Sequence, residues 1–214
     1  MRALQFTYIL ALMILMACHP SDETALEEEP ERDTVIVKEN IEYLEQELIG
    51  EKDAVTFAKH IVKLLKEGHM VALEVGSASS VYFSPYSYVD TAHVQEVQSI
   101  RFTQLYTGDE KLIWGVYDGT GDPIKMTFKE YLNRFALDFD PLAEGVQVSK
   151  DTIPSSRGNS LNNVREVFPK STVIEFYKPA SDPSGMNWRS LMMVLLEKDG
   201  KYRLKALVHS EWTI

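Results

Sequence analysis

The sequence predicts an α+β fold, in which N-terminal helices pack on a bent antiparallel sheet. Apolar residues recur every three or four positions between Glu39 and Gly68, which is typical of helices. Most of the chain beyond Val81 is instead rich in β-branched and aromatic residues between turn-forming stretches, which is typical of strands. With 214 residues, 44% of them hydrophobic, the chain has enough apolar material for one domain with appendages. This order, with helices first and a run of strands after them, is expected of an α+β domain.

Two helices are expected before Gly68. A short one carries Ile41, Leu44 and Leu48. A stronger one has its apolar face at Ala54, Phe57, Ala58, Ile61, Leu64 and Leu65. Lys63 and Lys66 followed by Gly68 are C-terminal helix signals. The short stretch 70–75 fits a helical turn or a strand equally well. We expect Ala54, Phe57, Ile61 and Leu65 to be buried against the inner face of the sheet.

Strands and one interrupting helix account for the rest of the domain. Two hairpins are expected around turn residues, one joining 81–83 to 87–89 and one joining 111–117 to 123–126. Thr127 and Glu130 are spaced as a capping box, which predicts a helix ending near Leu137. Another short helix is expected within 159–168. The final strands are predicted over 172–177, 188–197 and 201–208, the last two joined by a turn at 198–200.

The N-terminus predicts export and lipid attachment. Arg2 precedes an apolar run from Ile9 to Ala17, which has the pattern of a secretory signal peptide and is too short for a membrane-spanning helix. The next residue is Cys18, the only cysteine of the chain. The four residues ending there, Leu15-Met16-Ala17-Cys18, resemble the lipobox of bacterial lipoproteins, which implies that Cys18 receives the lipid. We therefore expect a signal peptide over 1–17, a lipidated Cys18 followed by an acidic tether over 18–38, and a single α+β domain over 39–214. A plain signal peptide with an unmodified cysteine is the alternative.

Charge and cysteine usage exclude several function classes. The formal net charge of −10 argues against nucleic acid as a partner, because phosphate backbones would be repelled. The domain after Cys18 contains no cysteine, which excludes disulfides, thiolate zinc sites and cysteine nucleophiles there. Asp118 and Asp122 lack the spacing of a calcium loop, and no nucleotide-binding glycine motif is present, so neither a metal nor a cofactor is expected.

The candidate ligand site combines aromatic and charged residues from the middle and the end of the chain. We expect a cavity between the helices and the sheet, with a rim formed by Tyr86, Trp114, Tyr131, Arg189 and His209. Arg189 is the main reason to expect an anionic small ligand, because a guanidinium can bind a carboxylate or phosphate through two parallel hydrogen bonds. A structural ion pair between Arg189 and Glu211 is the competing interpretation.

A catalytic interpretation is the alternative to ligand binding. His209 and Glu211 are two residues apart on a predicted strand, so they share a face on which the carboxylate could orient the imidazole. A hydrolase would then need Ser190 or Ser84 as its nucleophile. Neither serine lies in the sequence motif of a serine hydrolase, and a cross-strand polar cluster accounts for the same residues.

Three resemblances extend this interpretation. Leu15-Met16-Ala17-Cys18 resembles the lipobox of bacterial lipoproteins, although Met16 is larger than usual there. The phrases FSPY, WGVYDG, WRSL and HSEWTI resemble recurrent features of uncharacterised bacterial lipoproteins, a family that supplies no catalytic residues. The order of elements also resembles the nuclear transport factor 2-like cone, with helices over a curved sheet whose last two strands are long and paired.

The sequence therefore predicts a noncatalytic lipoprotein of the bacterial cell envelope, attached by its lipid to the extracytoplasmic face of the cell membrane or outer membrane. Its expected partners are the membrane, through the lipid anchor, and a small molecule or another envelope protein. A cell-envelope hydrolase that uses His209 and Glu211 is the alternative.

Overall fold

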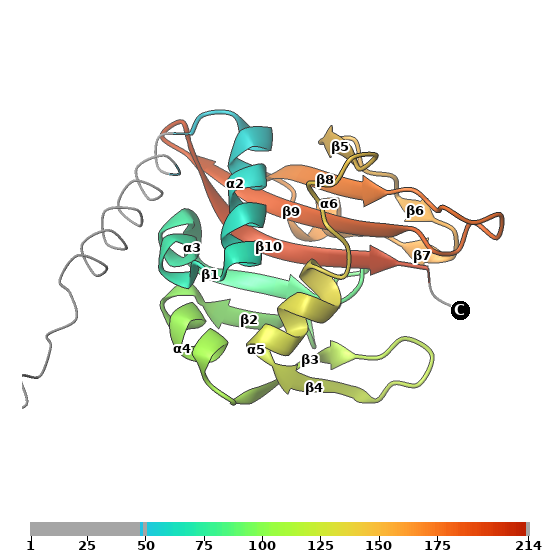
Figure 1. Ribbon diagram of the computed structural model, residues 1–214, viewed down its shortest axis with the longest axis horizontal. Coiled ribbons are helices and arrows are strands. Elements are labelled where there is room, and N and C mark those ends of the chain that lie inside the picture. Colours follow the sequence, from blue (N-terminus) through green and yellow to red (C-terminus); the bar gives the residue numbers. More distant parts are fainter. Residues whose placement is uncertain (1–47, 49–50, 213–214) are drawn as a thin grey trace, which may run out of the picture.

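The computed structural model describes Leu48 and residues 51–212, which form an α+β fold with the N-terminal helices on one face of a six-stranded sheet and a short later helix, α6, on the other (Figure 1). The helices are α2 (Ala54–Glu67), α3 (Met70–Gly76), η1 (Ser99–Arg101), α4 (Phe102–Thr107), α5 (Phe128–Tyr131), η2 (Leu132–Ala136) and α6 (Val164–Val167). The strands are β1 (Ser77–Ser84), β2 (Gln95–Gln98), β3 (Lys111–Val116), β4 (Pro123–Thr127), β5 (Gln147–Lys150), β6 (Ser156–Arg157), β7 (Ser160–Leu161), β8 (Thr172–Lys178), β9 (Arg189–Lys198) and β10 (Lys201–Glu211). The predicted fold class is confirmed.

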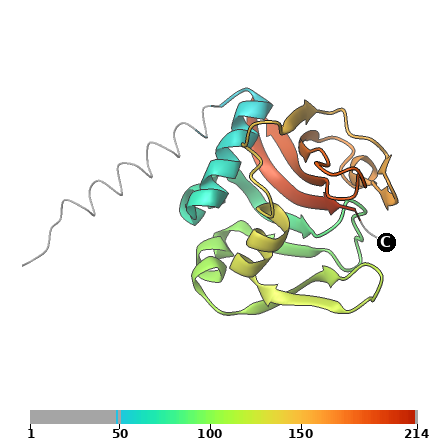
Figure 2. The ribbon, with the colours of Figure 1, turned by 45° about the vertical axis from the view of Figure 1, so that its right-hand side comes forward.

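The large sheet is mixed, whereas the sequence led us to expect an antiparallel one. Its strand order is β2-β1-β10-β9-β8-β5, and β1 runs parallel to β10 while the other neighbours are antiparallel. The sheet remains open, with β2 and β5 at its edges, and it curves around the helices that cover it (Figure 2). The parallel pair joins the start of the domain to its end, a long-range contact that no local pattern signals.

The last two strands form the long hairpin that the sequence predicts. β9 and β10 pair from Lys198 with Lys201 to Arg189 with Glu211. Asp199 and Gly200 both have positive φ, of 55° and 69°, which is the backbone of a two-residue turn matched to the twist of the strands. This register places Arg189 directly opposite Glu211 at the far end of the hairpin.

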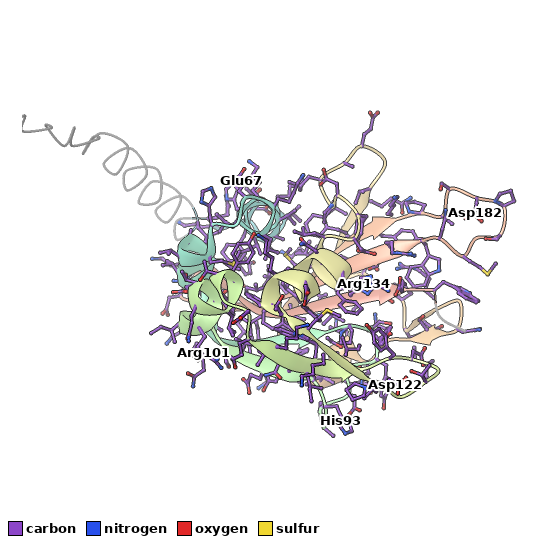
Figure 3. All side chains as sticks on the ribbon, turned by 60° about the horizontal axis from the view of Figure 1, so that its bottom comes forward. Glu67, His93, Arg101, Asp122, Arg134 and Asp182 are labelled. Carbon is purple, nitrogen blue, oxygen red and sulfur yellow. The ribbon has the colours of Figure 1, made fainter. Side chains whose placement is uncertain are left out.

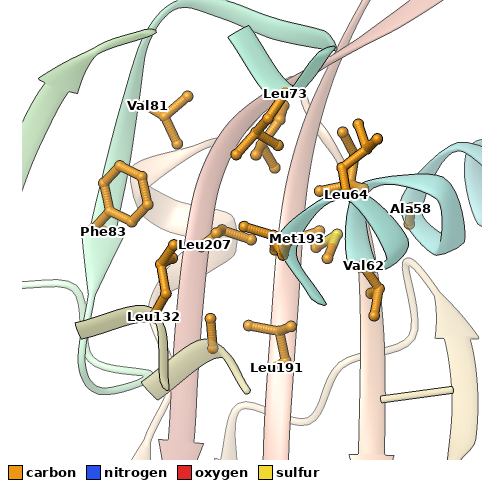
Figure 4. Close-up of a cluster of buried hydrophobic side chains, with 14 of the residues drawn as sticks. Ala58, Val62, Leu64, Leu73, Val81, Phe83, Leu132, Leu191, Met193 and Leu207 are labelled. Atoms are coloured by element: carbon orange, nitrogen blue, oxygen red, sulfur yellow. The ribbon is translucent and has the colours of Figure 1, made fainter. Parts of the chain in front are cut away.

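Helix α2 lies across the sheet and ends at Gly68, as predicted. The side chain of Asp53 accepts a hydrogen bond from the backbone N–H of Thr56 at 2.8 Å and caps the N-terminus. Gly68 ends the helix with φ of 73°, a conformation in which a side chain would be strained. Ala54, Phe57, Ile61 and Leu65 are all buried, as expected. Figure 4 shows Ala58, Val62 and Leu64 of this helix beside Leu191 and Met193 of β9.

A cluster of aromatic rings fills the space where we expected a cavity between the helices and the sheet. Phe83 of β1 is fully buried, and the rings of Phe102, Trp114, Phe128 and Tyr131 meet it edge-on, with centroid distances between 5.3 and 5.9 Å. Trp114 also stacks on Tyr131 at 4.3 Å. This part of the molecule is therefore packed core.

The β3–β4 hairpin and the helix after it match their sequence signals. Thr127 caps α5, its hydroxyl accepting from the backbone N–H of Glu130, while the Glu130 carboxylate accepts from the backbone N–H of Thr127. The helix continues as one π-helical turn, η2, and ends before Leu137. The stretch 70–75, which the sequence left open, is helical and belongs to α3.

The predicted strand at 87–89 is wrong. Residues 85–90 form a loop because Val89 bonds to a side chain in place of a neighbouring strand: the Asn163 side chain accepts from the Val89 N–H at 2.7 Å and donates to the Val89 carbonyl at 3.2 Å. Strand β1 pairs with β2 instead, which the sequence did not indicate. Around Gly158 the chain forms a small hairpin of β6 and β7, and α6 occupies part of the predicted 159–168 segment.

The predicted signal peptide, Cys18, the acidic tether and the helix carrying Ile41 and Leu44 lie outside the described residues. Leu48 is described and is buried in the core. Within residues 51–212, no helix has the length and apolar character needed to cross a membrane.

Candidate ligand-binding cleft

A cleft with a volume of about 700 Å³ lies beside the aromatic core, where three loops meet. The first loop follows β1, the second joins β3 to β4 and the third belongs to the β6–β7 hairpin. Figure 3 shows Asp122 on the second of these loops. The cleft is lined by Tyr86, Ser87, Tyr88, Asp90, Val116, Tyr117, Asp118, Gly119, Thr120, Gly121, Asn159, Ser160, Leu161 and Ser210. Its size is in the range of pockets that bind small molecules.

Side-chain hydrogen bonds hold the first and third loops together. Ser87 donates to the carbonyl of Leu161 at 2.8 Å, and Ser210 at the end of β10 donates to the Ser87 hydroxyl at 3.0 Å. Ser160 donates to the carbonyl of Glu211 at 3.0 Å. The wall of the cleft is thus attached to the end of the central strand β10, and we expect its shape to persist without a ligand.

Apolar surface is exposed along the cleft. Tyr88 is 57% exposed and Leu161 is 62% exposed, and Val116 and Tyr117 are also among the exposed large hydrophobic residues. Large apolar side chains are usually buried, so a group of them around one concavity is typical of a binding surface.

Of the five residues predicted to form a rim, only Tyr86 lines this cleft. Its hydroxyl accepts a hydrogen bond from the backbone N–H of Asp118 at 3.2 Å, which connects the first loop to the second. Burial raises the pKa of Tyr86, so its hydroxyl keeps its proton at neutral pH.

Trp114 and Tyr131 belong to the core and do not form the predicted rim. Trp114 is 0% exposed and Tyr131 is 1% exposed. The indole N–H of Trp114 donates to the carbonyl of Met126 at 2.8 Å, which satisfies its only donor. Trp114 borders a separate recess of about 70 Å³, too small for a ligand of ordinary size.

Arg189 lies in the ion pair that the sequence offered as the alternative to an anion site. Its Nε is 2.8 Å from Asp138 Oδ2, its Nη2 is 3.4 Å from Glu211 Oε2, and its Nη1 donates to the carbonyl of Trp188. Glu211 also pairs with Arg134 at 2.7 Å. We call Arg134, Asp138, Arg189, His209 and Glu211 the ionic cluster.

His209 is almost fully buried at the inner side of the ionic cluster. Its Nδ1 is 2.9 Å from the carbonyl of Pro85, and because a carbonyl only accepts, Nδ1 carries a hydrogen. Its Nε2 is 3.3 Å from Asp138 Oδ2. The contact between Nε2 and Asp138 Oδ2 is a hydrogen bond when a proton lies between these two atoms.

The ionic cluster does not have the geometry of a serine hydrolase. Ser84 donates to the carbonyl of Tyr86, and Ser190 donates to Glu175 Oε1 at 2.7 Å. Neither hydroxyl is therefore directed at His209 as a nucleophile would be. The ligating atoms of Asp138, His209 and Glu211 lie within 4.8 Å of one another, but Arg189 neutralises both carboxylates. A dication there would have to displace a guanidinium, so the residues fit a metal poorly.

Sequence reasoning missed a second buried charge, Glu175 on β8, which is 3% exposed. Arg157 binds it through two nitrogens, at 2.7 and 3.3 Å. The same guanidinium stacks on the ring of Tyr177 at 3.8 Å. A buried acid satisfied by a forked guanidinium and a serine ties the β6–β7 hairpin to the sheet. A glutamate within an otherwise apolar strand was the signal that could have revealed it.

Comparisons with known proteins do not assign this chain to a family. No protein-family model matches the sequence, and no curated protein matches it. Among solved structures, the crystal structure of a DUF4783 family protein from Bacteroides ovatus covers 72% of this chain and 94% of its own, with 8% identity and a TM-score of 0.34. A similarity at this level carries no weight for the function.

Proposed function

We propose that this protein is a noncatalytic lipoprotein of the bacterial cell envelope, whose domain binds a small molecule in the cleft between the loops 85–90, 116–121 and 159–161. The observation that carries the proposal is the cleft itself. It combines a volume of about 700 Å³ with exposed aromatic side chains and with several polar groups at fixed positions. Few monomeric surfaces gather such features without a ligand.

The chemistry around the cleft favours binding over catalysis. Candidate serine nucleophiles donate to acceptors other than His209, and the carboxylates of the ionic cluster are paired with arginines. These groups stabilise the end of the β9–β10 hairpin. A hydrolase using His209 and Glu211 would have to break these ion pairs before it could act.

The binding site can be tested by NMR titration of the purified protein with a set of small molecules that spans neutral, cationic and anionic compounds. We expect at least one compound to shift the backbone resonances of the loops 116–121 and 159–161 in a saturable manner. The control is Ile100→Ser, which alters an apolar side chain that is 77% exposed and does not line the cleft. Binders that map elsewhere, or no binders at all, would refute the proposed function.

The lipid anchor is a separate part of the proposal and rests on the sequence around Cys18. We expect the mature chain to begin at a diacylated Cys18 and to sediment with membranes, as an acylated protein does when the chains insert into the bilayer. Cys18→Ser should release the protein into the soluble fraction or leave the precursor unprocessed. Mass spectrometry showing an unmodified mature N-terminus at another residue would exclude the anchor.

A further inference from the structure

We infer that the ligand of the cleft is an organic cation, such as a quaternary ammonium compound or a polyamine, held by tyrosine rings and by the carboxylate of Asp118. This inference rests on the proposed function and names the chemical class of the ligand. It also replaces the anion that Arg189 led us to expect, because Arg189 is bound to Asp138 and Glu211 and does not line the cleft.

The charges that face the cleft are negative. Among the described residues, those lining the cleft include the carboxylates of Asp90 and Asp118 and no lysine or arginine. Asp90 contacts the Nδ1 of His93 at 2.6 Å, whereas no cation of the described chain pairs with Asp118. Arg134 is close enough to influence Tyr86, but its guanidinium is bound to Glu211. A ligand that carries positive charge would therefore meet an uncompensated carboxylate.

The serine hydroxyls of the cleft present acceptors to a ligand. Ser87, Ser160 and Ser210 donate their protons to protein atoms, at 2.8, 3.0 and 3.0 Å. What each hydroxyl retains toward the cleft is lone-pair capacity. An acceptor-rich wall next to a carboxylate favours a ligand rich in N–H or polarised C–H donors.

Three tyrosines line the cleft without a lysine or arginine of the described residues over their rings, although the ring of Tyr86 also packs on Phe135. Elsewhere in the part of the chain that the structure describes, lysine or arginine side chains lie over the rings of Tyr82, Tyr106 and Tyr177. No such pair within that part involves Tyr86, Tyr88 or Tyr117, which line the cleft. Clustered aromatic faces beside a carboxylate are the usual recognition device for quaternary ammonium groups.

The charge of the whole protein acts in the same direction. A formal net charge of −10 attracts small cations over long range and repels anions. For an anionic ligand this field would oppose binding, whereas for a cationic ligand it increases the local concentration at the cleft.

The test compares two probes of nearly equal shape, choline and its uncharged analogue 3,3-dimethylbutan-1-ol, with spermidine, maltose and acetate as further arms. Each is titrated into the full chain while the backbone resonances of residues 116–121 are followed by NMR. We expect choline or spermidine to bind at least about 5-fold more tightly than the uncharged analogue, because a cation on aromatic faces gains an attraction that the neutral isostere lacks. Added salt should weaken this binding.

Two variants in the same loop locate the charge. Asp118→Asn should weaken cation binding about 3- to 10-fold, since it removes the carboxylate but keeps its shape. Asp122→Asn is the matched control, because Asp122 lies in the same loop and does not line the cleft. Circular dichroism of both variants verifies that they remain folded. Tyr88→Phe should retain cation binding and Tyr88→Ala should weaken it, because the ring face is the contact.

The outcomes separate this inference from the proposed function. If the uncharged analogue, maltose or acetate binds in the cleft as well as the cations do, or if Asp118→Asn and Asp122→Asn behave alike, the cleft is a binding site but its ligand class is not cationic. If no probe of any charge perturbs residues 116–121, both proposals are refuted. Saturable binding of a cation that depends on Asp118 and not on Asp122 supports both.

Discussion

Replacing Phe83 by leucine tests whether the aromatic cluster, in addition to apolar burial, stabilises the domain. Phe83 and Phe57 are both fully buried, so the same substitution removes a similar amount of apolar surface at the two positions. They differ in their ring contacts. Phe83 meets four rings edge-on between 5.3 and 5.9 Å, whereas Phe57 has one ring partner, Tyr202, at 6.1 Å.

The difference between the two substitutions gives the expected magnitude. An aromatic pair contributes about 0.5–1.5 kcal/mol beyond the burial of its area. Three additional pairs at Phe83 therefore set an upper range of about 1.5–4.5 kcal/mol, which is reduced because a single ring cannot optimise all of its contacts. We expect Phe83→Leu to lower the free energy of unfolding by about 1–3 kcal/mol more than Phe57→Leu does.

Urea unfolding followed by circular dichroism measures both free energies, with thermal unfolding as a second readout at about 2–4 °C per kcal/mol for a domain of this size. The m-values of the two variants should agree, so that the denatured states are comparable. Equal losses at the two positions would show that the edge-on contacts add nothing to burial, and the stabilising role of the aromatic cluster would be refuted.

Two further predictions concern charged groups. Arg189→Lys should lower the free energy of unfolding by about 1 kcal/mol, since a lysine cannot reach Asp138, Glu211 and the Trp188 carbonyl together. Choline binding should persist in this variant, because Arg189 supports the cleft loop but does not line the cleft. Abolished choline binding in a folded variant would contradict our location of the site. Asp53→Ala should cost about 1 kcal/mol by removing the cap of α2. The hydrogen bond from the Thr56 backbone N–H lowers the pKa of Asp53 below its usual value of 3.8. The loss of stability caused by Asp53→Ala should therefore be fully present above pH 3.8 and disappear as the pH falls through the lower pKa of the folded state. A loss of stability that is independent of pH between 2 and 6 would contradict the cap.

Local signals in the sequence predicted the elements that depend on neighbouring residues. The C-terminal glycine of α2, the capping box at Thr127 and the turn at Asp199 each concern residues a few positions apart. The parallel pairing of β1 with β10 could not be predicted in this way. It joins segments from opposite ends of the domain, and a strand's alternating pattern does not specify the direction of its neighbour.

The candidate site was predicted less well than the fold, for a related reason. Tyr86 is the one predicted rim residue that lines the cleft, and its neighbours there come from three loops whose spatial proximity depends on the Asn163 and Ser87 hydrogen bonds. Trp114 and Tyr131 have polar atoms that suggested a pocket, yet their rings complete the core. Amphipathic aromatic residues suit both environments, so composition alone does not distinguish a pocket wall from a core layer.

The ionic cluster connects the end of strand β10 to the loop that forms one wall of the cleft. The buried imidazole of His209 donates to the carbonyl of Pro85, and the next residue, Tyr86, bonds to the opposite wall of the cleft through Asp118. Arg189 and Arg134 stabilise the carboxylates around that imidazole. The residues that first suggested catalysis are therefore placed to hold the cleft loop in a fixed position, which reduces the entropy that a ligand would otherwise have to overcome on binding.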